Sequence, residues 1–404
     1  MFALLAAYHA CSNANKVNLT IGAYRDAGGK PYVLQCVKEA EAALLADATV
    51  TKEYLPILGM PAFRKAAQHV LLTRELAATL ETRLVTAQTL SGTGALRLAL
   101  DTLRSSGAAA GAARLVLVSN PTWNNHKNLI QLAGLTPGEY RYLHAASNSL
   151  DLAGMLADLT AAPDNSIVIL HACAHNPTGI DATDAQWREI ARVMRSKRHL
   201  PLFDVAYQGY VTGDPVADGA AVRLFASFGT DMVVCQSFSK NLGLYSERIG
   251  AAHFLLGDTP DVAARLAAIS SVLERHARGT YSNPPAHGAH IVARVVLDDR
   301  LRALWYSELK VMADRIELMR KRLREELEKL EAGGPTRTWH HITEQRGMFA
   351  YTGLAPKEVE HVVNDHAVYM TAAGRISIAG LTLDNVAYTA RAFRDAINAA
   401  KSKL

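Results

Sequence analysis

Short aliphatic and β-branched runs alternate along the chain with segments whose apolar residues recur at helical spacing. The expected strands lie within residues 114–120, 165–175, 200–207, 231–240 and 250–257. One expected helix covers residues 184–198, where Thr183 and Gln186 have the spacing of a capping box. Continuous apolar strands separated by helices are typical of a parallel or mixed sheet covered on both faces. The pattern therefore predicts an α/β fold with a mostly parallel mixed sheet.

The pattern changes after residue 297. Residues 298–330 form a long, highly charged helical pattern, which the residues 333–335 (Gly-Gly-Pro) would end. We interpret its Lys, Arg and Glu run, 319–329, as a solvated helix face with i,i+4 pairs. Two hairpin-like runs and a closing helix follow, at 339–354, 374–381 and 383–401.

This change predicts two domains. We expect a large domain over residues 31–310 and a smaller α/β domain built from residues 1–30 and 311–404. In this division the chain begins in the small domain, forms the large domain, and returns to the small domain at its end.

Composition excludes several classes of protein. Among 404 residues, 43 Lys and Arg face 38 Asp and Glu, and a net charge of +5 is too small to indicate a nucleic-acid or membrane-surface partner. The four cysteines are too few and too scattered for a disulfide framework, which fits a reducing compartment. The opening sequence matches neither a signal nor a transit peptide, and no run approaches the ~18–20 apolar residues of a membrane span. We expect a soluble protein.

A lysine follows the last but one predicted strand. Residues 237–250 (SFSKNLGLYSERIG) place Lys240 just past a strand's carboxyl end, where open α/β sheets bind their ligands. Ser237, Ser239 and Arg248 flank it, so it could form a Schiff base beside a phosphate group. The alternative is a solvated lysine in a polar surface loop.

A glycine-rich turn opens the helical pattern at 90–103. Backbone N–H groups at Ser91, Gly92 and Thr93 would form an anion site at a helix N-terminus. Arg97 stands where a dinucleotide fingerprint has its third glycine, so that interpretation is poor. The turn could also be only the start of a helix.

Other polar residues suit a pyridine ring. Asp204 ends an apolar strand, and a buried carboxylate there needs a partner or a reaction. A carboxylate paired with a protonated ring nitrogen is what pyridoxal phosphate (PLP) requires to act as an electron sink. Tyr207 lies three residues after Asp204, Asn176 could donate to a phenolate oxygen, and Trp123 offers a surface for ring stacking.

A metal site is not expected. In a strand, His171, Cys173 and His175 would project from one face, which is a possible ligand arrangement. No carboxylate or further cysteine follows at ligand spacing, so we interpret these histidines as core residues or as residues that support the site.

Together these segments resemble the class I PLP-dependent aminotransferases of fold type I, in their aspartate aminotransferase branch. The similarity extends in order over nearly the whole chain, from residues 16–26 (KVNLTIGAYRD) to 372–381 (AAGRISIAGL). Between them lie EYLPILGMPAF, SGTGALR, NPTWNNH, LHACAHNPTG, FDVAYQG, SFSKNLGLYSERIG, YSNPPAHGA and GMFAYTGL.

The resemblance implies PLP as cofactor and assigns its contacts. Lys240 matches the Schiff-base lysine, and Asp204, supported by His126, matches the partner of the ring nitrogen. The phosphate contacts would be Ser91, Gly92, Thr93, Ser237 and Arg248. Asn176 and Tyr207 match donors to the phenolic oxygen, and Trp123 matches the stacking residue; Trp123 and Asn176 would also face the substrate.

It also implies substrate contacts and a homodimer with composite active sites. Arg375 matches the arginine that holds the substrate α-carboxylate, and Gly22 lies in a loop that closes over substrate. Arg278 would bind the distal carboxylate in the neighbouring subunit's site, and Tyr54 would reach that subunit's phosphate. Only about fifteen residues precede Lys16, so contacts between subunits through an N-terminal arm are in doubt.

The expected activity is transamination of L-aspartate with 2-oxoglutarate to oxaloacetate and L-glutamate, by a ping-pong route. The alternatives are a class I transaminase that prefers aromatic amino acids and a catalytically silent protein of the same fold. The final Ser402-Lys403-Leu404 matches a peroxisomal import signal, which predicts a peroxisome-type organelle, with a cytoplasmic location as the alternative.

Overall fold

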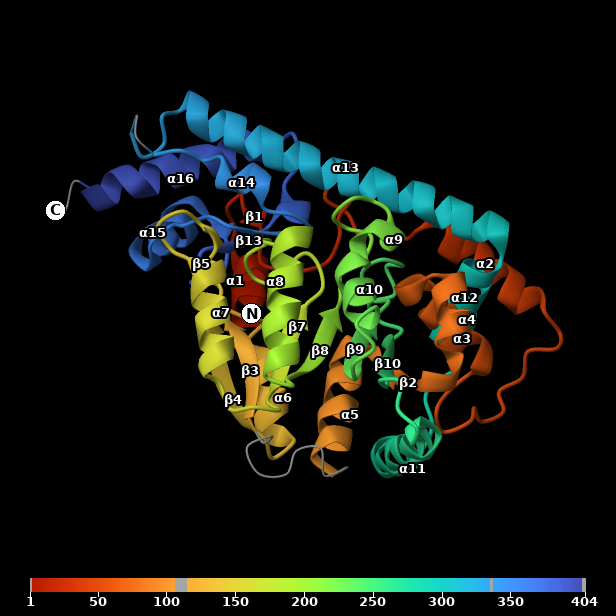
Figure 1. Ribbon diagram of the computed structural model, residues 1–404. Helices are drawn as coiled ribbons and strands as arrows, with labels where there is room; N and C mark the ends of the chain where they lie inside the picture. Colours follow the sequence, from red (N-terminus) through yellow and green to blue (C-terminus); the bar gives the residue numbers. More distant parts are fainter. Residues whose placement is uncertain (1, 106–114, 335–336, 402–404) are drawn as a thin grey trace.

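A seven-stranded mixed sheet forms the centre of the computed structural model, which describes residues 2–105, 115–334 and 337–401 (Figure 1). The strands lie in the order β2 (Leu84–Leu90), β10 (Ile249–Leu255), β9 (Met232–Ser237), β8 (Leu200–Val205), β7 (Ile167–His171), β3 (Leu115–Asn120) and β4 (Thr136–Arg141). β10 is antiparallel to both of its neighbours, and the remaining pairs are parallel. The predicted α/β fold is confirmed.

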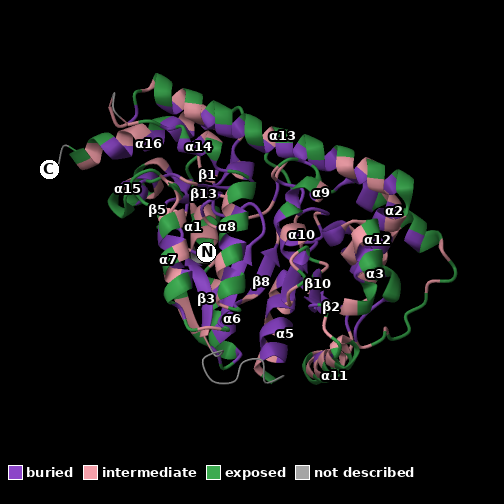
Figure 2. Ribbon diagram, in the orientation of Figure 1, coloured by how far each residue is buried: buried purple, intermediate pink, exposed green. Residues whose placement is uncertain are grey.

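Helices cover both faces of this sheet. One face packs against α5 (Ser91–Ser105), α6 (Asn125–Leu132) and α11 (Val262–Thr280), and the other against α7 (Leu152–Ala161), α8 (Asp184–Ser196) and α10 (Ala220–Ala226). The central strands β7, β8 and β9 are buried along almost their whole length, and the outer faces of α7, α8 and α11 are exposed (Figure 2). Burial on both faces explains why these strands are continuous apolar runs.

The predicted capping box begins α8. The Thr183 hydroxyl accepts the N–H of Gln186, and the Gln186 side chain accepts the N–H of Thr183. Two N–H groups that the first helical turn leaves unpaired are thereby satisfied.

The long charged pattern is helix α13 (Asp299–Lys329), which crosses the top of the molecule in Figure 1 and is capped by Asp298. Its expected solvated face is wrong in part. Arg320 is 3% exposed, and Leu323 and Leu327 are fully buried, because this end of α13 packs against α14 (His341–Glu344) and α16 (Val386–Lys401). The expected i,i+4 pairing does occur, between Arg324 and Glu328.

The two ends of the chain meet beside α13. β1 (Val17–Asn18) pairs in parallel with β12 (Val368–Tyr369), and β11 (Phe349–Tyr351) pairs with β13 (Arg375–Ser377). The remaining described elements are α1 (Phe2–Ala10), α2 (Gln35–Ala46), α3 (Pro61–Leu72), α4 (Arg74–Thr79), the 3₁₀ turns Glu81–Arg83 and Ile378–Gly380, β5 (Leu143–His144), β6 (Ser149–Leu150), α9 (Pro215–Asp218), α12 (His287–Leu297) and α15 (Pro356–His366). Ser402, Lys403 and Leu404 lie outside the described residues.

The strand expected over 165–175 is shorter than its apolar run. β7 ends at His171, and Ala174 adopts a left-handed φ of +50°. The N–H groups of Ala174 and His175 bond to the Asp181 carboxylate and take no part in the sheet. The alternation that would align His171, Cys173 and His175 on one strand face is therefore absent.

Candidate active site

The carboxyl ends of β8 and β9 meet the N-terminus of α5 around a cavity of about 190 Å³. It is lined by Gly22, Ser91, Gly92, Thr93, Leu96, Trp123, Asn176, Asp204, Ala206, Tyr207, Ser237, Ser239, Lys240, Tyr245 and Arg248. Eleven predicted site residues meet here from segments far apart in sequence.

Hydroxyls, a guanidinium and a helix N-terminus gather at one side of the cavity. The Ser91 and Ser239 hydroxyl oxygens are 3.0 Å apart, and the Arg248 Nη1 atom lies 3.5 Å from the Ser239 oxygen. A Cβ atom at Gly92 would come within 3.0 Å of the Ser237 Cβ atom, so glycine keeps the backbone accessible there. This is the arrangement that binds a phosphate group at the start of a helix.

Two strained backbone positions lie at the same place. Ser91 and Arg248 adopt left-handed φ angles of +66° and +51°, which are costly for residues with side chains. Gly250 permits the close contact, because a Cβ atom there would lie 2.6 Å from the Ser91 carbonyl carbon. The strained conformation orients the first turn of α5 toward the cavity.

Lys240 lies three residues beyond the end of β9. Its Nζ atom is 5.1 Å from the centre of the Tyr207 ring, and its backbone carbonyl accepts the Tyr210 hydroxyl at 3.0 Å. Burial lowers the pKa of the Lys240 amine; the Asp204 charge opposes this shift and the Arg248 charge adds to it. A lysine with a lowered pKa serves more readily as a nucleophile and a base near neutral pH.

A hydrogen-bond network runs inward from Asp204. The His126 Nε2 atom lies 3.1 Å from a carboxylate oxygen of Asp204, and the Thr122 hydroxyl lies 2.9 Å from His126 Nδ1 and 3.3 Å from His171 Nε2. Burial acts to raise the pKa of the Asp204 carboxyl, but the hydrogen bond from His126 and the charges of His126, His171 and Lys240 together lower it below its ordinary value. Asp204 is therefore held as a carboxylate with an oxygen available to the cavity.

Arg375 is buried beside this cavity. Its Nη2 atom donates to the Thr20 carbonyl at 2.9 Å, its Nη1 atom donates to the Asn176 side-chain oxygen at 3.3 Å, and the guanidinium lies 4.4 Å from the Phe349 ring centre. The Nε atom has no hydrogen-bond partner. A 5%-exposed guanidinium without a carboxylate partner among the described residues is suited to hold an anionic ligand.

Gly22 lies against Phe349. A Cβ atom at Gly22 would approach the Phe349 ring to 2.8 Å, so only glycine lets the N-terminal loop lie this close to Phe349. Phe349 in turn meets the Tyr207 ring edge to face at 5.6 Å between ring centres.

Two predicted site residues do not reach this cavity within their own chain. Tyr54 is 83% exposed, in the extended segment between α2 and α3. Arg278 is exposed near the end of α11, where its Nη1 atom donates to the Ser282 hydroxyl at 2.7 Å. Neither belongs to the lining.

The sequence interpretation missed several members of the site. One is Tyr245, which lies within the segment 237–250 that was singled out for Lys240. Its side chain lines the cavity, and its hydroxyl oxygen accepts the N–H of Tyr24 at 2.8 Å. Thr122 joins His126 to His171 and lies in the quoted NPTWNNH segment. Both residues could have been proposed from their motifs, but only the fold shows their contacts. No group of metal-ligating side chains is found in residues 2–105, 115–334 and 337–401.

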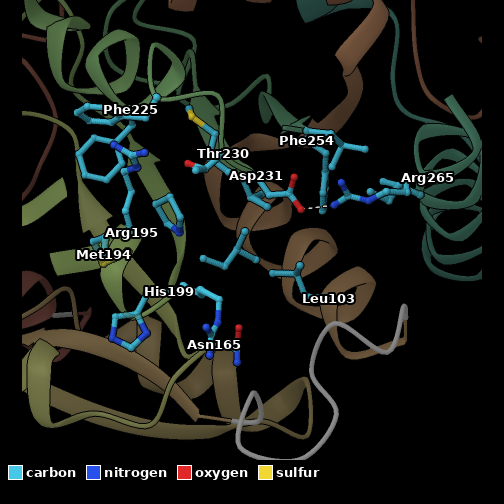
Figure 3. Close-up of a pocket in the computed structure, with 18 of the residues that line it drawn as sticks. Leu103, Asn165, Met194, Arg195, His199, Phe225, Thr230, Asp231, Phe254 and Arg265 are labelled. Carbon is cyan, nitrogen blue, oxygen red and sulfur yellow. Dashed lines mark hydrogen bonds and ion pairs between the residues drawn. The ribbon is translucent and has the colours of Figure 1, made fainter. Parts of the chain in front are cut away.

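A larger cavity, of about 640 Å³, lies at the opposite edge of the sheet (Figure 3). It is bounded mainly by apolar side chains, among them Met194, Phe225, Val233, Phe254 and Ile269. The Arg265–Asp231 ion pair drawn there joins α11 to the start of β9. It contains none of the predicted site residues.

Known proteins of similar sequence and structure are aminotransferases. Residues 14–393 match the family model of class I and II aminotransferases. A mitochondrial aspartate aminotransferase of Schizosaccharomyces pombe is 46% identical over 402 residues, which cover 100% of this chain and 88% of that protein. Among solved structures, a cytoplasmic aspartate aminotransferase of Saccharomyces cerevisiae has a TM-score of 0.94 and 41% identity, covering 98% of this chain and 95% of that chain.

A second solved structure bears on the cofactor. The aromatic-amino-acid aminotransferase of Burkholderia pseudomallei, covalently bound to pyridoxal phosphate, has a TM-score of 0.91 and 40% identity, covering 98% of this chain and 96% of that chain. None of the helices that the structure describes has both the length and the hydropathy to cross a bilayer.

Proposed function

The chain belongs to the class I and II aminotransferases, a family of PLP-dependent transaminases, and we propose that it is an aspartate aminotransferase. The proposed reaction converts L-aspartate and 2-oxoglutarate to oxaloacetate and L-glutamate. The observation that carries the proposal is that Lys240 and Asp204 line one cavity, while the buried Arg375 lies beside it and donates to the lining residue Asn176.

The residues present fit pyridoxal phosphate. The hydroxyls of Ser91, Ser237 and Ser239, the Arg248 guanidinium and the first turn of α5 would hold its phosphate, while Trp123 and Asp204 would contact its ring. When bound, the cofactor supplies an electron sink for the carbanion that forms at the substrate α-carbon.

Side chains of this protein carry out the proton transfer and hold the charges that the reaction needs. Lys240 Nζ removes the proton from the substrate α-carbon, and burial favours the neutral amine that this step needs. Asp204, hydrogen-bonded to His126, keeps a negative charge where a ring nitrogen would be protonated. Asn176 and Tyr207 would donate to the phenolic oxygen.

In this proposal, two arginines bind the two carboxylates of the substrate. Arg375 binds the α-carboxylate with Gly22 above it, and Arg278 of a neighbouring subunit binds the distal carboxylate. The exposure of Arg278 and Tyr54 supports composite sites, because neither side chain has a role in its own cavity. We therefore propose a twofold homodimer.

A substrate panel tests the activity. The kcat/KM for L-aspartate should exceed that for L-tyrosine by at least about tenfold, since one charge-assisted hydrogen bond contributes about 1.5–3 kcal/mol. An equal or higher value for tyrosine would instead assign the chain to the transaminases that prefer aromatic amino acids. A purified protein that shows no visible absorption after incubation with PLP and removal of the free cofactor would indicate a silent member of the fold.

Hybrid dimers test the composite site. A Lys240→Ala chain mixed with an Arg278→Leu chain should form dimers with one intact site and regain activity. Confirmed hybrids without activity would show that Arg278 serves its own subunit.

We also propose that residues 31–310 form the large domain and that residues 1–30 and 311–404 form the small domain. The pairing of β1 with β12 supports the return of the N-terminal residues to the C-terminal part. The boundary then falls inside α13, which would connect the two domains as one continuous helix.

The location in a peroxisome-type organelle stays a proposal from Ser402-Lys403-Leu404, which lie outside the described residues. The two aspartate aminotransferases compared above are a mitochondrial and a cytoplasmic protein. A fluorescent reporter fused to the last dozen residues tests the proposal, and a diffuse cytosolic signal would contradict it.

A further inference from the structure

A third cavity, of about 400 Å³, lies under the middle of α13. Its walls come from three segments: the loop 210–212 after β8, the face 310–321 of α13, and residues 343–347 before β11. It shares no lining residue with the cavity around Lys240. We call it the α13 cleft.

Positive charge dominates the α13 cleft. Four cations and two carboxylates line it: Lys310, Arg320, Lys321, Arg346, Asp314 and Glu317. The two lysines are paired with the two carboxylates along α13, so the arginines account for the excess.

Arg320 is the buried member. Its Nη1 atom donates to the Ile342 carbonyl at 2.9 Å, and its Nη2 atom donates to the carbonyls of Gly347, at 2.8 Å, and Phe349. Its Nε atom is buried without a hydrogen-bond partner, and no carboxylate lies within ion-pair distance in the described part of the chain. Burial lowers the pKa of Arg320 to about 9, so the guanidinium is still charged at neutral pH.

Arg346 lies on the opposite wall and is exposed. Its backbone N–H bonds to the Gly179 carbonyl at 2.6 Å, but its guanidinium makes no hydrogen bond or ion pair with any described residue. Asp181 interacts with Arg346 and Arg320 through space from a buried position outside the lining. The α13 cleft has an excess of positive charge even with this carboxylate included.

We propose that the α13 cleft binds a small dianion, either inorganic phosphate or a short dicarboxylate. Its volume lies within the usual range of about 300–1,000 Å³ for small-molecule sites. The Arg346 guanidinium, which is planar and unpaired, would contact the anion directly, while Lys310 and Lys321 can turn toward it from the rim. The buried charge of Arg320 adds a fixed attraction from the floor of the α13 cleft.

The bound anion would act on the neighbouring cavity through two contacts. Arg320 holds the Phe349 carbonyl, and the Phe349 ring lies against Arg375. On the other wall, Tyr210 donates to the Lys240 carbonyl. We expect occupation of the α13 cleft to change the KM for carboxylate substrates; this consequence rests on the proposed function, whereas the binding itself does not.

Isothermal titration of the PLP-loaded protein with inorganic phosphate tests the binding. Saturable binding tighter than about 10 mM is expected, and Arg346→Gln should weaken it at least about tenfold, which corresponds to about 1.4 kcal/mol. Arg346→Lys keeps the charge and should lose less than Arg346→Gln. The matched control is Arg322→Gln, which removes an equal charge from α13 outside the lining.

A second titration uses succinate as the dicarboxylate probe. It is carried out with the Arg375→Leu variant, so that the proposed active-site arginine does not contribute to the binding. Tighter Arg346-dependent binding of succinate than of phosphate assigns the α13 cleft to dicarboxylates, and the reverse order assigns it to phosphate. Failure of both probes to bind, or equal losses in Arg346→Gln and Arg322→Gln, overturns the proposal. Neither result affects the substrate panel, which tests the proposed activity with the unaltered chain.

Discussion

One cavity lies where the parallel strands of the central sheet have their carboxyl ends, which we call the carboxyl edge, and a second lies at the other ends of these strands, the opposite edge. The smaller cavity, at the carboxyl edge, holds the reactive groups. At the carboxyl edge, about 190 Å³ is enclosed by Lys240, Asp204, Arg248 and several hydroxyls. At the opposite edge, a cavity more than three times as large is bounded mainly by apolar side chains (Figure 3). Cavity size is therefore a poor guide to the site in this protein.

The charged groups at the two edges differ in their partners. At the opposite edge, Arg265 pairs with Asp231 and Arg198 pairs with Asp164, although the His199 Nδ1 atom there also has no hydrogen-bond partner. At the carboxyl edge, Arg375 retains an unpartnered Nε atom, and Lys240 has no ion pair among the described residues. Polar groups that stay incomplete in a folded protein are those that a ligand completes. Left-handed φ angles occur at both edges, at Ser91 and Arg248 and at Asn165 and Arg198, so they do not distinguish the two edges.

Lys240→Ala gives the largest effect expected at the carboxyl edge. Loss of the base should reduce kcat by about 10²–10⁴-fold or more, because no second amine lines the cavity to accept the α-proton. Binding of PLP, followed by fluorescence quenching, should persist through the phosphate cradle and ring contacts. Unchanged turnover would exclude Lys240 from the mechanism.

Substitutions of Arg375 and Arg278 should differ in how their effects depend on the charge of the substrate side chain. Arg375→Leu should lower kcat/KM for aspartate and tyrosine alike, by about 10–100-fold, because both substrates carry an α-carboxylate. Arg278→Leu should lower it by a similar factor for aspartate and much less for tyrosine. Equal losses on both substrates in Arg278→Leu would mean that Arg278 is a structural residue.

Sequence pattern predicted the carboxyl edge better than the rest of the molecule. Lys240 could be placed because a continuous apolar run ends just before it, and the family resemblance collected the residues of the cavity. β2 was missed because its polar residues are internal: Thr86 bonds to Gln68 and His253, and Gln88 donates to the Pro285 carbonyl.

The α13 cleft could not be predicted from the sequence. The loop 210–212 precedes the other two walls by about a hundred residues, and Arg320 lies in a charged run that resembles an exposed helix face. Its burial depends on α14 and on the carbonyl groups before β11, which only the tertiary fold brings to α13.

We expect acid to lower the free energy of unfolding through His253, a buried histidine in the central sheet. Burial lowers the pKa of His253 to about 3, whereas an unfolded histidine titrates near about 6.5. The unfolded chain therefore binds a proton that the folded chain excludes, and stability falls as pH decreases from about 6.5 toward 3.

His253→Gln tests this linkage. It should reduce the acid dependence of the unfolding free energy by up to about 1.4 kcal/mol per pH unit in that range, measured by urea denaturation of the PLP-loaded protein. The exposed His340 provides the control, since His340→Gln should leave the slope unchanged. An unaltered slope in His253→Gln would show that His253 is already protonated in the folded state.

Arg195→Gln gives the smallest expected effect and is the sharpest test of the comparison. Arg195 lines the opposite cavity and lies over the Phe228 ring at 5.2 Å, a contact that contributes about 0.5–1 kcal/mol at an exposed position. Thermal denaturation should therefore show a small loss of stability. The kcat/KM for aspartate should stay within about twofold of the unaltered protein, because a change of 1.4 kcal/mol would be needed for a factor of ten. A loss of tenfold or more would mean that the opposite edge is coupled to catalysis, and the separation between the two edges would have to be abandoned.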